Sequence, residues 1–175
     1  MLFNETQIEG AWLVDLQRIG DERGFFARAW CAKEFEEHGI SSKLTQANLS
    51  YSMKKGTLRG MHYQVEPKTE MKAVRCVRGA LFDVIIDLRL ESKTYKKWIG
   101  FELNEENKLM LVVPEGCAHG FLTLCEKTEA FYLVSTAYDP DSERGIRWDD
   151  PSFNVKWPFN PIEISNKDKS WRNYE

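Results

Sequence analysis

This sequence has few histidines and no large surplus of charge of either sign. The chain of 175 residues has only three histidines, and 24 Lys and Arg stand against 27 Asp and Glu, which leaves a formal net charge of −3. A balance of this kind gives no basic field that would gather nucleic acid or an anionic membrane. We therefore expect neither as a partner, and any anionic ligand must be held by local cations.

Paired cysteine motifs and long apolar runs are missing as well. The four cysteines contain no CxxC pair, residues 1–5 do not resemble a secretory signal, and no apolar run approaches the roughly 20 residues that cross a bilayer. We expect a soluble protein of the reducing cytoplasm.

Short apolar runs, rich in β-branched and aromatic residues, are separated by glycine, proline and charged turns. The length and a hydrophobic content of 42% predict a single domain, residues 1–175, with a sizeable core. Helix is predicted only at 32–38, closed by Gly39, and as a short turn at 168–172, so His38 is expected on the surface at a helix end. The sequence thus predicts an all-β antiparallel sandwich or barrel, with strands in the runs 11–14, 73–77, 80–88, 98–103, 109–113 and 129–134.

The other two histidines lie in apolar segments with glycines. His62 follows Arg59 and Gly60, Lys72 comes ten residues later, and His119 precedes a further glycine. Strand alternation would place Arg59 and His62 on opposite faces, but a bulge at Gly60 would turn both inward. Core histidines or metal ligands are alternative interpretations. A metal site usually needs two or three imidazoles and a carboxylate, and the chain has no HxH pair, so we expect no metal.

A series of motifs runs in order along the chain and together resembles one family. The chain is similar to the dTDP-4-dehydrorhamnose 3,5-epimerases, which are cofactor-free members of the cupin superfamily. The resemblance extends from residue 21 to residue 168, and it rests on the segments DERGFF (21–26), QANLS (46–50), GTLRGMHYQ (56–64), DVIIDLR (83–89), VPEGCAHGF (113–121), WDDP (148–151) and SNKD (165–168).

This resemblance implies a cupin-type double-stranded β-helix, or jelly roll, with a few short helices and no cofactor. It implies a homodimer in which the N-terminal part of one subunit reaches the partner's site. The implied reaction is 3,5-epimerisation of a nucleotide-diphosphate 4-keto-6-deoxy sugar, dTDP-4-dehydro-6-deoxy-D-glucose to dTDP-4-dehydro-L-rhamnose. This step belongs to the supply of rhamnose for cell-surface polysaccharide.

The resemblance also assigns catalytic roles. His62 matches the base that removes a proton next to the ketone, a task suited to an imidazole with an unperturbed pKa of ~6.5. Asp168 matches the carboxylate that orients this ring, Lys72 the cation that stabilises the enolate, and Tyr132 the proton donor on the opposite face. From the residues alone, Asp168 and Lys72 would be surface charges, and Tyr132 would be a core aromatic.

Further positions match substrate-binding residues, with the cations suited to a diphosphate. Tyr138 matches a residue that packs on the nucleotide. Each of these residues alone would be a surface charge or a turn residue, and only their joint occurrence favours a site. The others are Arg23, Gln46, Asn48, Arg59, His119, Glu143 and Lys167.

One departure concerns the nucleotide base. Arg28 stands where the family commonly has glutamate, and Ala47 where it often has aspartate. Glutamate accepts a hydrogen bond from the thymine imide, whereas arginine only donates. We therefore hypothesise that guanine or cytosine is accepted, or a differently decorated sugar. The alternatives are a C3 or C5 single-site epimerase on a GDP- or CDP-linked sugar, a metal-dependent cupin oxygenase or isomerase, and a non-catalytic cupin that binds nucleotide sugars.

Overall fold

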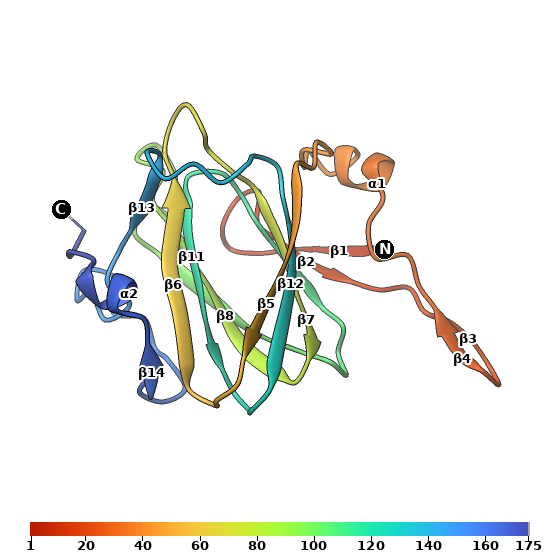
Figure 1. The fold of residues 1–175 in the computed structure, drawn as a ribbon. Helices are drawn as coiled ribbons and strands as arrows, with labels where there is room; N and C mark the ends of the chain where they lie inside the picture. Colours follow the sequence, from red (N-terminus) through yellow and green to blue (C-terminus); the bar gives the residue numbers. More distant parts are fainter. Residues whose placement is uncertain (175) are drawn as a thin grey trace.

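The computed structural model describes residues 1–174, and two antiparallel sheets packed face to face form its body (Figure 1). The first sheet has the order β1 (Leu2–Glu5), β2 (Trp12–Asp15), β10 (Met110–Val113), β7 (Lys72–Arg78), β12 (Thr128–Val134) and β5 (Gln46–Ser52). The second has the order β13 (Glu143–Gly145), β6 (Thr57–Gln64), β11 (Cys117–Thr123), β8 (Ala80–Asp87) and β9 (Trp98–Asn104), and β14 (Glu163–Ile164) pairs with β6 in parallel.

A small hairpin stands apart from this body. Strands β3 (Ile19–Asp21) and β4 (Gly24–Phe26) pair only with each other and project away from the two sheets (Figure 1). The hairpin carries apolar side chains into solvent, with Ile19 71%, Phe25 49% and Phe26 69% exposed. Apolar side chains gathered on a projecting element are typical of a surface that packs against another molecule.

The main core lies between the sheets because alternate residues of each strand point to the same face. Leu81 and Ile85 of β8 and Leu111 of β10 are fully buried in this cluster. Two further clusters cover the outer faces. Phe35 of α1 (Ala32–Glu36) packs on the first sheet, and Phe153 of the C-terminal segment packs on the second.

The sequence predictions for the fold are largely confirmed. Each of the six predicted apolar runs coincides with a strand, three of them (11–14, 80–88 and 109–113) extending one residue beyond it, and the architecture is the predicted antiparallel all-β sandwich. The first helix begins where predicted but ends at Glu36, because Gly39 at φ +69° closes it with hydrogen bonds from Gly39 N to Glu36 O and from Ile40 N to Phe35 O. The C-terminal turn is the helix α2 (Asn166–Ser170), which begins earlier because the Ser165 hydroxyl accepts a hydrogen bond from Asp168 N.

His38 lies just beyond the end of α1, as predicted, but it is half-buried rather than solvated. Its ring stacks on Phe3 at a centroid distance of 3.9 Å and meets the edge of Trp12 at 5.2 Å. Its Nδ1 lies 2.7 Å from the Glu34 carbonyl oxygen, to which it donates. The imidazole thus packs against Phe3 of β1 and hydrogen-bonds to α1, which connects the N-terminal strand to the helix.

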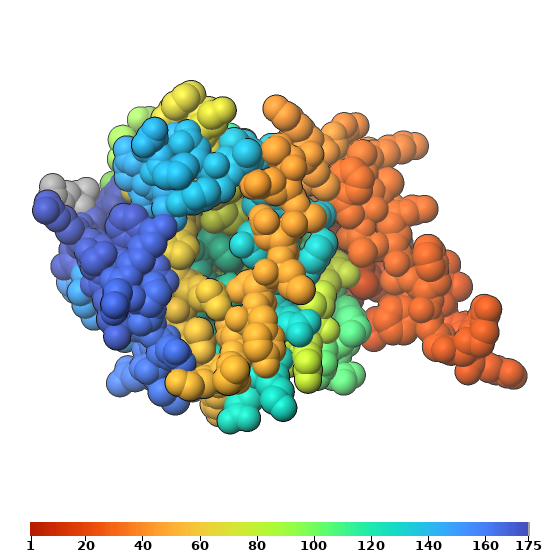
Figure 2. Space-filling model, in the orientation of Figure 1, coloured from red at the N-terminus to blue at the C-terminus, as the bar shows by residue number. Residues whose placement is uncertain are grey.

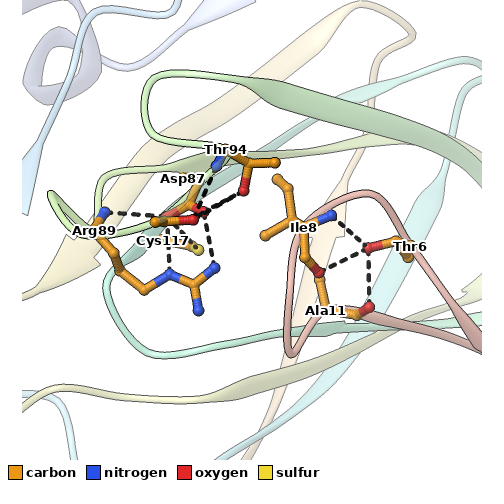
Figure 3. A network of polar contacts seen from close by, with 8 residues as sticks. Thr6, Ile8, Ala11, Asp87, Arg89, Thr94 and Cys117 are labelled. Carbon is orange, nitrogen blue, oxygen red and sulfur yellow. Dashed lines mark hydrogen bonds and ion pairs between the residues drawn. The ribbon is translucent and has the colours of Figure 1, made fainter.

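A buried carboxylate organises the loop after β8 (Figure 3). Asp87 is fully buried and accepts hydrogen bonds from the Arg89 guanidinium and from the hydroxyls of Ser92 and Thr94. Although burial alone raises the pKa of this carboxyl, these donors hold it well below its usual range. Cys117 lies against the same carboxylate, and its own burial raises the pKa of the thiol to about 12, so it is an inert core group.

Residues 1–174 include no helix that is both long and apolar enough to cross a membrane.

Candidate active site

A cavity of about 430 Å³ opens between the two sheets, and a hollow of about 360 Å³ adjoins it. His62, Lys72 and Tyr132 line both, so the two form one cleft. Figure 2 shows the surface hollowed between the segments of β5 and β6, with green and teal atoms at its floor. The first sheet supplies β5, β7 and β12 to the walls, the second supplies β6 and β11, and β14 with α2 closes one side.

The backbone at Gly60 turns two functional side chains to the same side. In the pairing of β6 with β11, His62 lies opposite His119 and Arg59 opposite Phe121, so the register shifts by one residue between them. Gly60 has φ +132°, and a Cβ there would lie 2.5 Å from the Gly120 Cα. Only glycine allows this approach. Arg59 and His62 both line the cavity, which confirms the predicted bulge.

His62 is held by a buried carboxylate. Its Nε2 lies 2.6 Å from Oδ1 of Asp168, while Oδ2 accepts from Gly60 N at 3.3 Å. Asp168 is 4% exposed. Burial raises the pKa of its carboxyl, but the hydrogen bond and charge of His62 outweigh burial, so the pKa lies below its usual value. An ionised Asp168 fixes the ring and leaves Nδ1 free of a carboxylate partner.

A second histidine and carboxylate lie beside the first pair. His119 is buried, and its Nε2 lies 2.5 Å from Oδ1 of Asp83, which is fully buried on β8. The two histidines are directly opposite each other on neighbouring strands. His119 lines the cavity, as expected of a substrate contact, but its polar partner is this carboxylate.

The opposite wall carries Lys72 and Tyr132. The Lys72 ammonium lies 2.9 Å from Oε1 of Glu70, and the two side chains are only 12% and 11% exposed. The pKa of Tyr132 is raised, first by burial and then by the charge of Glu70, against the opposing charge of Arg59. The phenol therefore stays protonated, and a protonated hydroxyl can give a proton.

The outer part of the cleft holds several predicted binding residues together. Glu143 accepts from the Tyr138 hydroxyl at 2.9 Å and pairs with Lys167 at 2.5 Å. Gln46 accepts from Tyr138 N at 3.1 Å. Burial raises the pKa of Glu143, but Lys167 and Tyr138 outweigh it, so the carboxylate is ionised and holds the ammonium in place.

Two predicted binding residues lie on β5 and β6. Asn48 lines the smaller hollow and pairs with Tyr132 across the strands. Arg59 donates through Nε to the Ser52 hydroxyl at 3.2 Å and through Nη2 to the Tyr51 carbonyl oxygen at 2.9 Å. Both bonds anchor the guanidinium at the rim of the cavity.

Arg23 is the one predicted site residue that the chain does not bring to the cleft. It lies at the turn of the projecting hairpin, pairs with Asp21, and its side chain is 89% exposed. Arg28 also lies outside both hollows, and its guanidinium pairs with Glu34 of α1 at 2.8 Å.

Four residues of the site are not predicted from the sequence. Glu70 and Asp83 pair with site residues, Ser165 caps the helix that carries Asp168, and the Trp171 ring lies 6.5 Å from that of His62. Asp83 and Ser165 lie within two of the quoted motifs, but neither position shows from the sequence which distant side chain or helix it contacts. Among residues 1–174, no group of three or more His, Cys, Asp or Glu is arranged to hold a metal ion.

Comparisons with known proteins agree on one family. The family model of dTDP-4-dehydrorhamnose 3,5-epimerase matches residues 5–175. The dTDP-4-dehydrorhamnose 3,5-epimerase of Shigella flexneri is 44% identical over 165 residues, covering 94% of this chain and 91% of that protein. The dTDP-4-dehydrorhamnose 3-epimerase of Streptomyces niveus is 37% identical, covering 93% and 78%.

A crystal structure of the Bacillus anthracis 3,5-epimerase, with TDP and PPi bound, superposes with a TM-score of 0.95 at 38% identity, covering 99% of each chain. The likeness extends over whole chains in sequence and in structure, which confirms the cupin-type fold. The chain belongs to the dTDP-4-dehydrorhamnose 3,5-epimerase family of carbohydrate isomerases.

Proposed function

We propose that the protein epimerises dTDP-4-dehydro-6-deoxy-D-glucose at C3 and C5 to dTDP-4-dehydro-L-rhamnose. The observation that carries the proposal is the cleft between the sheets, with a carboxylate-held imidazole on one wall and a half-buried phenol on the other. Inversion at carbon needs a base on one face of the ring and an acid on the other, and two facing sheets supply one each.

The proposed step begins at a C–H bond next to the ketone. His62 takes the proton through Nδ1, and Asp168 stabilises the imidazolium. The electron pair of the C–H bond becomes the double bond of an enolate, and the carbonyl pair moves to oxygen, where the Lys72 ammonium donates a hydrogen bond. Tyr132 then gives its proton to the opposite face of the carbon, and solvent restores both residues. His62 thereby exchanges the substrate proton with water.

We propose that the remaining cleft residues bind the nucleotide. The cations Arg59 and Lys167 suit the diphosphate, and the Tyr138 ring suits stacking on the base. His119, Gln46, Asn48 and Glu143 complete the polar lining. A non-catalytic binding protein would not need a paired base and acid.

Incubation with dTDP-4-dehydro-6-deoxy-D-glucose in deuterated water, followed by NMR of the sugar, tests the reaction. We expect deuterium at C3 and C5, and no exchange at either carbon in the His62→Ala variant. Exchange at C3 alone would instead indicate the activity named for the Streptomyces niveus relative. Binding without any exchange would refute an enzymatic role.

We also propose that the enzyme is a homodimer in which the β3–β4 hairpin packs against the partner and carries Arg23 to the partner's cleft. The hairpin's exposed apolar residues and the exposed Arg23 support this. Mixing His62→Ala with Arg23→Ala subunits tests it, because a mixed dimer then has one intact cleft. Activity must rise on mixing, and no rise would refute the exchange.

We propose the cytoplasm as its location. All four cysteines are free thiols, which suits a reducing compartment.

A further inference from the structure

A carboxylate lies in the wall of the cleft where the proposed reaction has no step for it. Glu70 pairs with Lys72 at 2.9 Å, and the exposed fractions of the two side chains are 11% and 12%. It also lines the smaller hollow with His62 and Tyr132. Withdrawing two opposite charges from water costs free energy, and only a well-formed ion pair offsets that cost. The geometry of the Glu70–Lys72 pair is therefore expected to be maintained.

The backbone around Glu70 presents it to the cleft. Glu70 and Lys72 form an ion pair and line the same hollow, so both point into the cleft, and Met71 between them is buried in the cluster on the opposite face. Met71 N donates to the Ser135 hydroxyl at 2.8 Å, and Ser135 N donates to the Met71 carbonyl oxygen at 3.0 Å. The Thr136 hydroxyl donates a hydrogen bond to the Thr69 carbonyl oxygen at 2.7 Å. The residues on both sides of Glu70, Thr69 and Met71, therefore have their backbones fixed by hydrogen bonds.

Lysine by itself is poorly placed to act as an oriented donor. Its ammonium ends a flexible four-carbon chain, and it gains direction only from a partner that fixes it. Glu70 takes one of its three N–H donors, and two are left for a ligand. The pair also compensates the charge of Lys72 within the cleft.

We propose that Glu70 is a positioning residue that holds the Lys72 ammonium at the place where the enolate oxygen of the substrate forms. The inference rests on the proposed epimerase function. Glu70 acts through Lys72 and does not itself exchange a proton with the sugar.

The variants Glu70→Ala and Glu70→Gln test this assignment by steady-state epimerisation and by deuterium exchange. The ketone of the bound substrate carries less charge than the enolate, so losing the orientation of Lys72 affects the transition state most. We expect Glu70→Ala to lower kcat by about tenfold to a hundredfold, with KM changed by less than about threefold. The Gln variant keeps an oxygen that accepts the ammonium, so we expect it to recover most of kcat.

The pH profile separates the charge of Glu70 from its geometry. Tyr132 lies beside Glu70 and Lys72 on one wall, and Arg59 and His62 lie across the cleft. After burial, the charge of Glu70 is the next cause that raises the pKa of Tyr132. Because Glu70→Gln removes that charge, the basic limb of its rate profile must move to lower pH. A residue needed only for folding would leave both the profile and kcat per folded molecule unchanged.

Glu115→Ala is the matched control. Glu115, in the loop between β10 and β11, accepts from the hydroxyl of Thr69, the residue before Glu70, at 2.9 Å, but it lines neither hollow. It should keep wild-type kcat. Wild-type kcat in Glu70→Ala, or an equal loss in the Ala and Gln variants with an unmoved profile, would overturn the proposal. An inactive wild-type protein would instead refute the epimerase function itself.

Discussion

The pair of His62 and Asp168 gives the most informative substitution, Asp168→Asn. The carboxylate accepts two hydrogen bonds, from His62 Nε2 at 2.6 Å and from Gly60 N at 3.3 Å. Asparagine has nearly the same shape but only one accepting oxygen. One of the two donors must therefore face an NH₂ group, or the imidazole must take the other tautomer, with its proton on Nδ1, where the proposed base must be free.

The size of the effect follows from these contacts. A hydrogen bond to a charged group contributes about 1.5–3 kcal/mol, which is roughly 10- to 150-fold in rate. The wrong tautomer adds to this loss, so we expect deuterium exchange at neutral pH to fall on the order of 10²- to 10⁴-fold.

The assay is the initial rate of deuterium incorporation into the sugar, followed by NMR, with the folded fraction checked by circular dichroism. Asp149→Asn is the control, because Asp149 also pairs with a cation, Arg147 at 2.8 Å, but at the surface. It should exchange at the wild-type rate. If Asp168→Asn exchanged within about threefold of wild type, the carboxylate would not orient the base and the proposed mechanism would be wrong.

Further predictions concern the acid, the fold, the nucleotide and pH. Tyr132→Phe should impair epimerisation more than exchange, as NMR in deuterated water would show, because proton removal survives without the donor; equal losses would contradict this. Asp87→Asn should lower the free energy of unfolding in urea by about 2–4 kcal/mol through lost charge-assisted bonds, and an unchanged midpoint would contradict this. Isothermal titration should give dTDP, GDP and CDP affinities within about tenfold of each other, and Arg28→Glu should favour dTDP; a clear dTDP preference in the wild type would remove the hypothesis. The pKa of Asp168 is lowered by folding, so its contribution to stability is present above its ordinary value of 3.8 and is lost as the pH falls through the lower folded value; the stability of Asp168→Asn measured against pH should lack this loss.

The sequence predicts six of the strands because each contains a run of apolar residues that the fold largely buries, and it predicts the bulge because Gly60 stands between two polar residues that need the same face. It fails where a contact joins distant segments. His38 was expected in solvent, yet Phe3, which lies 35 positions earlier, stacks on it. Glu70 follows a proline-containing turn and has the composition of a loop, and only the pairing of the neighbouring Met71 backbone with Ser135 holds it at the cleft.

The two-sheet architecture bears on why some relatives are named 3,5-epimerases and another a 3-epimerase. Under the proposed assignment, His62 belongs to one sheet and Tyr132 to the other, so the sugar lies between a base and an acid that stay fixed. Both carbons next to the ketone carry an acidic C–H bond, and each can be inverted only when it lies between these two groups. Inversion at C3 and C5 therefore requires the sugar to shift within the cleft while Lys72 keeps the ketone oxygen. Under the same assignment, a cleft that held the sugar in one position would invert a single carbon with the same catalytic residues.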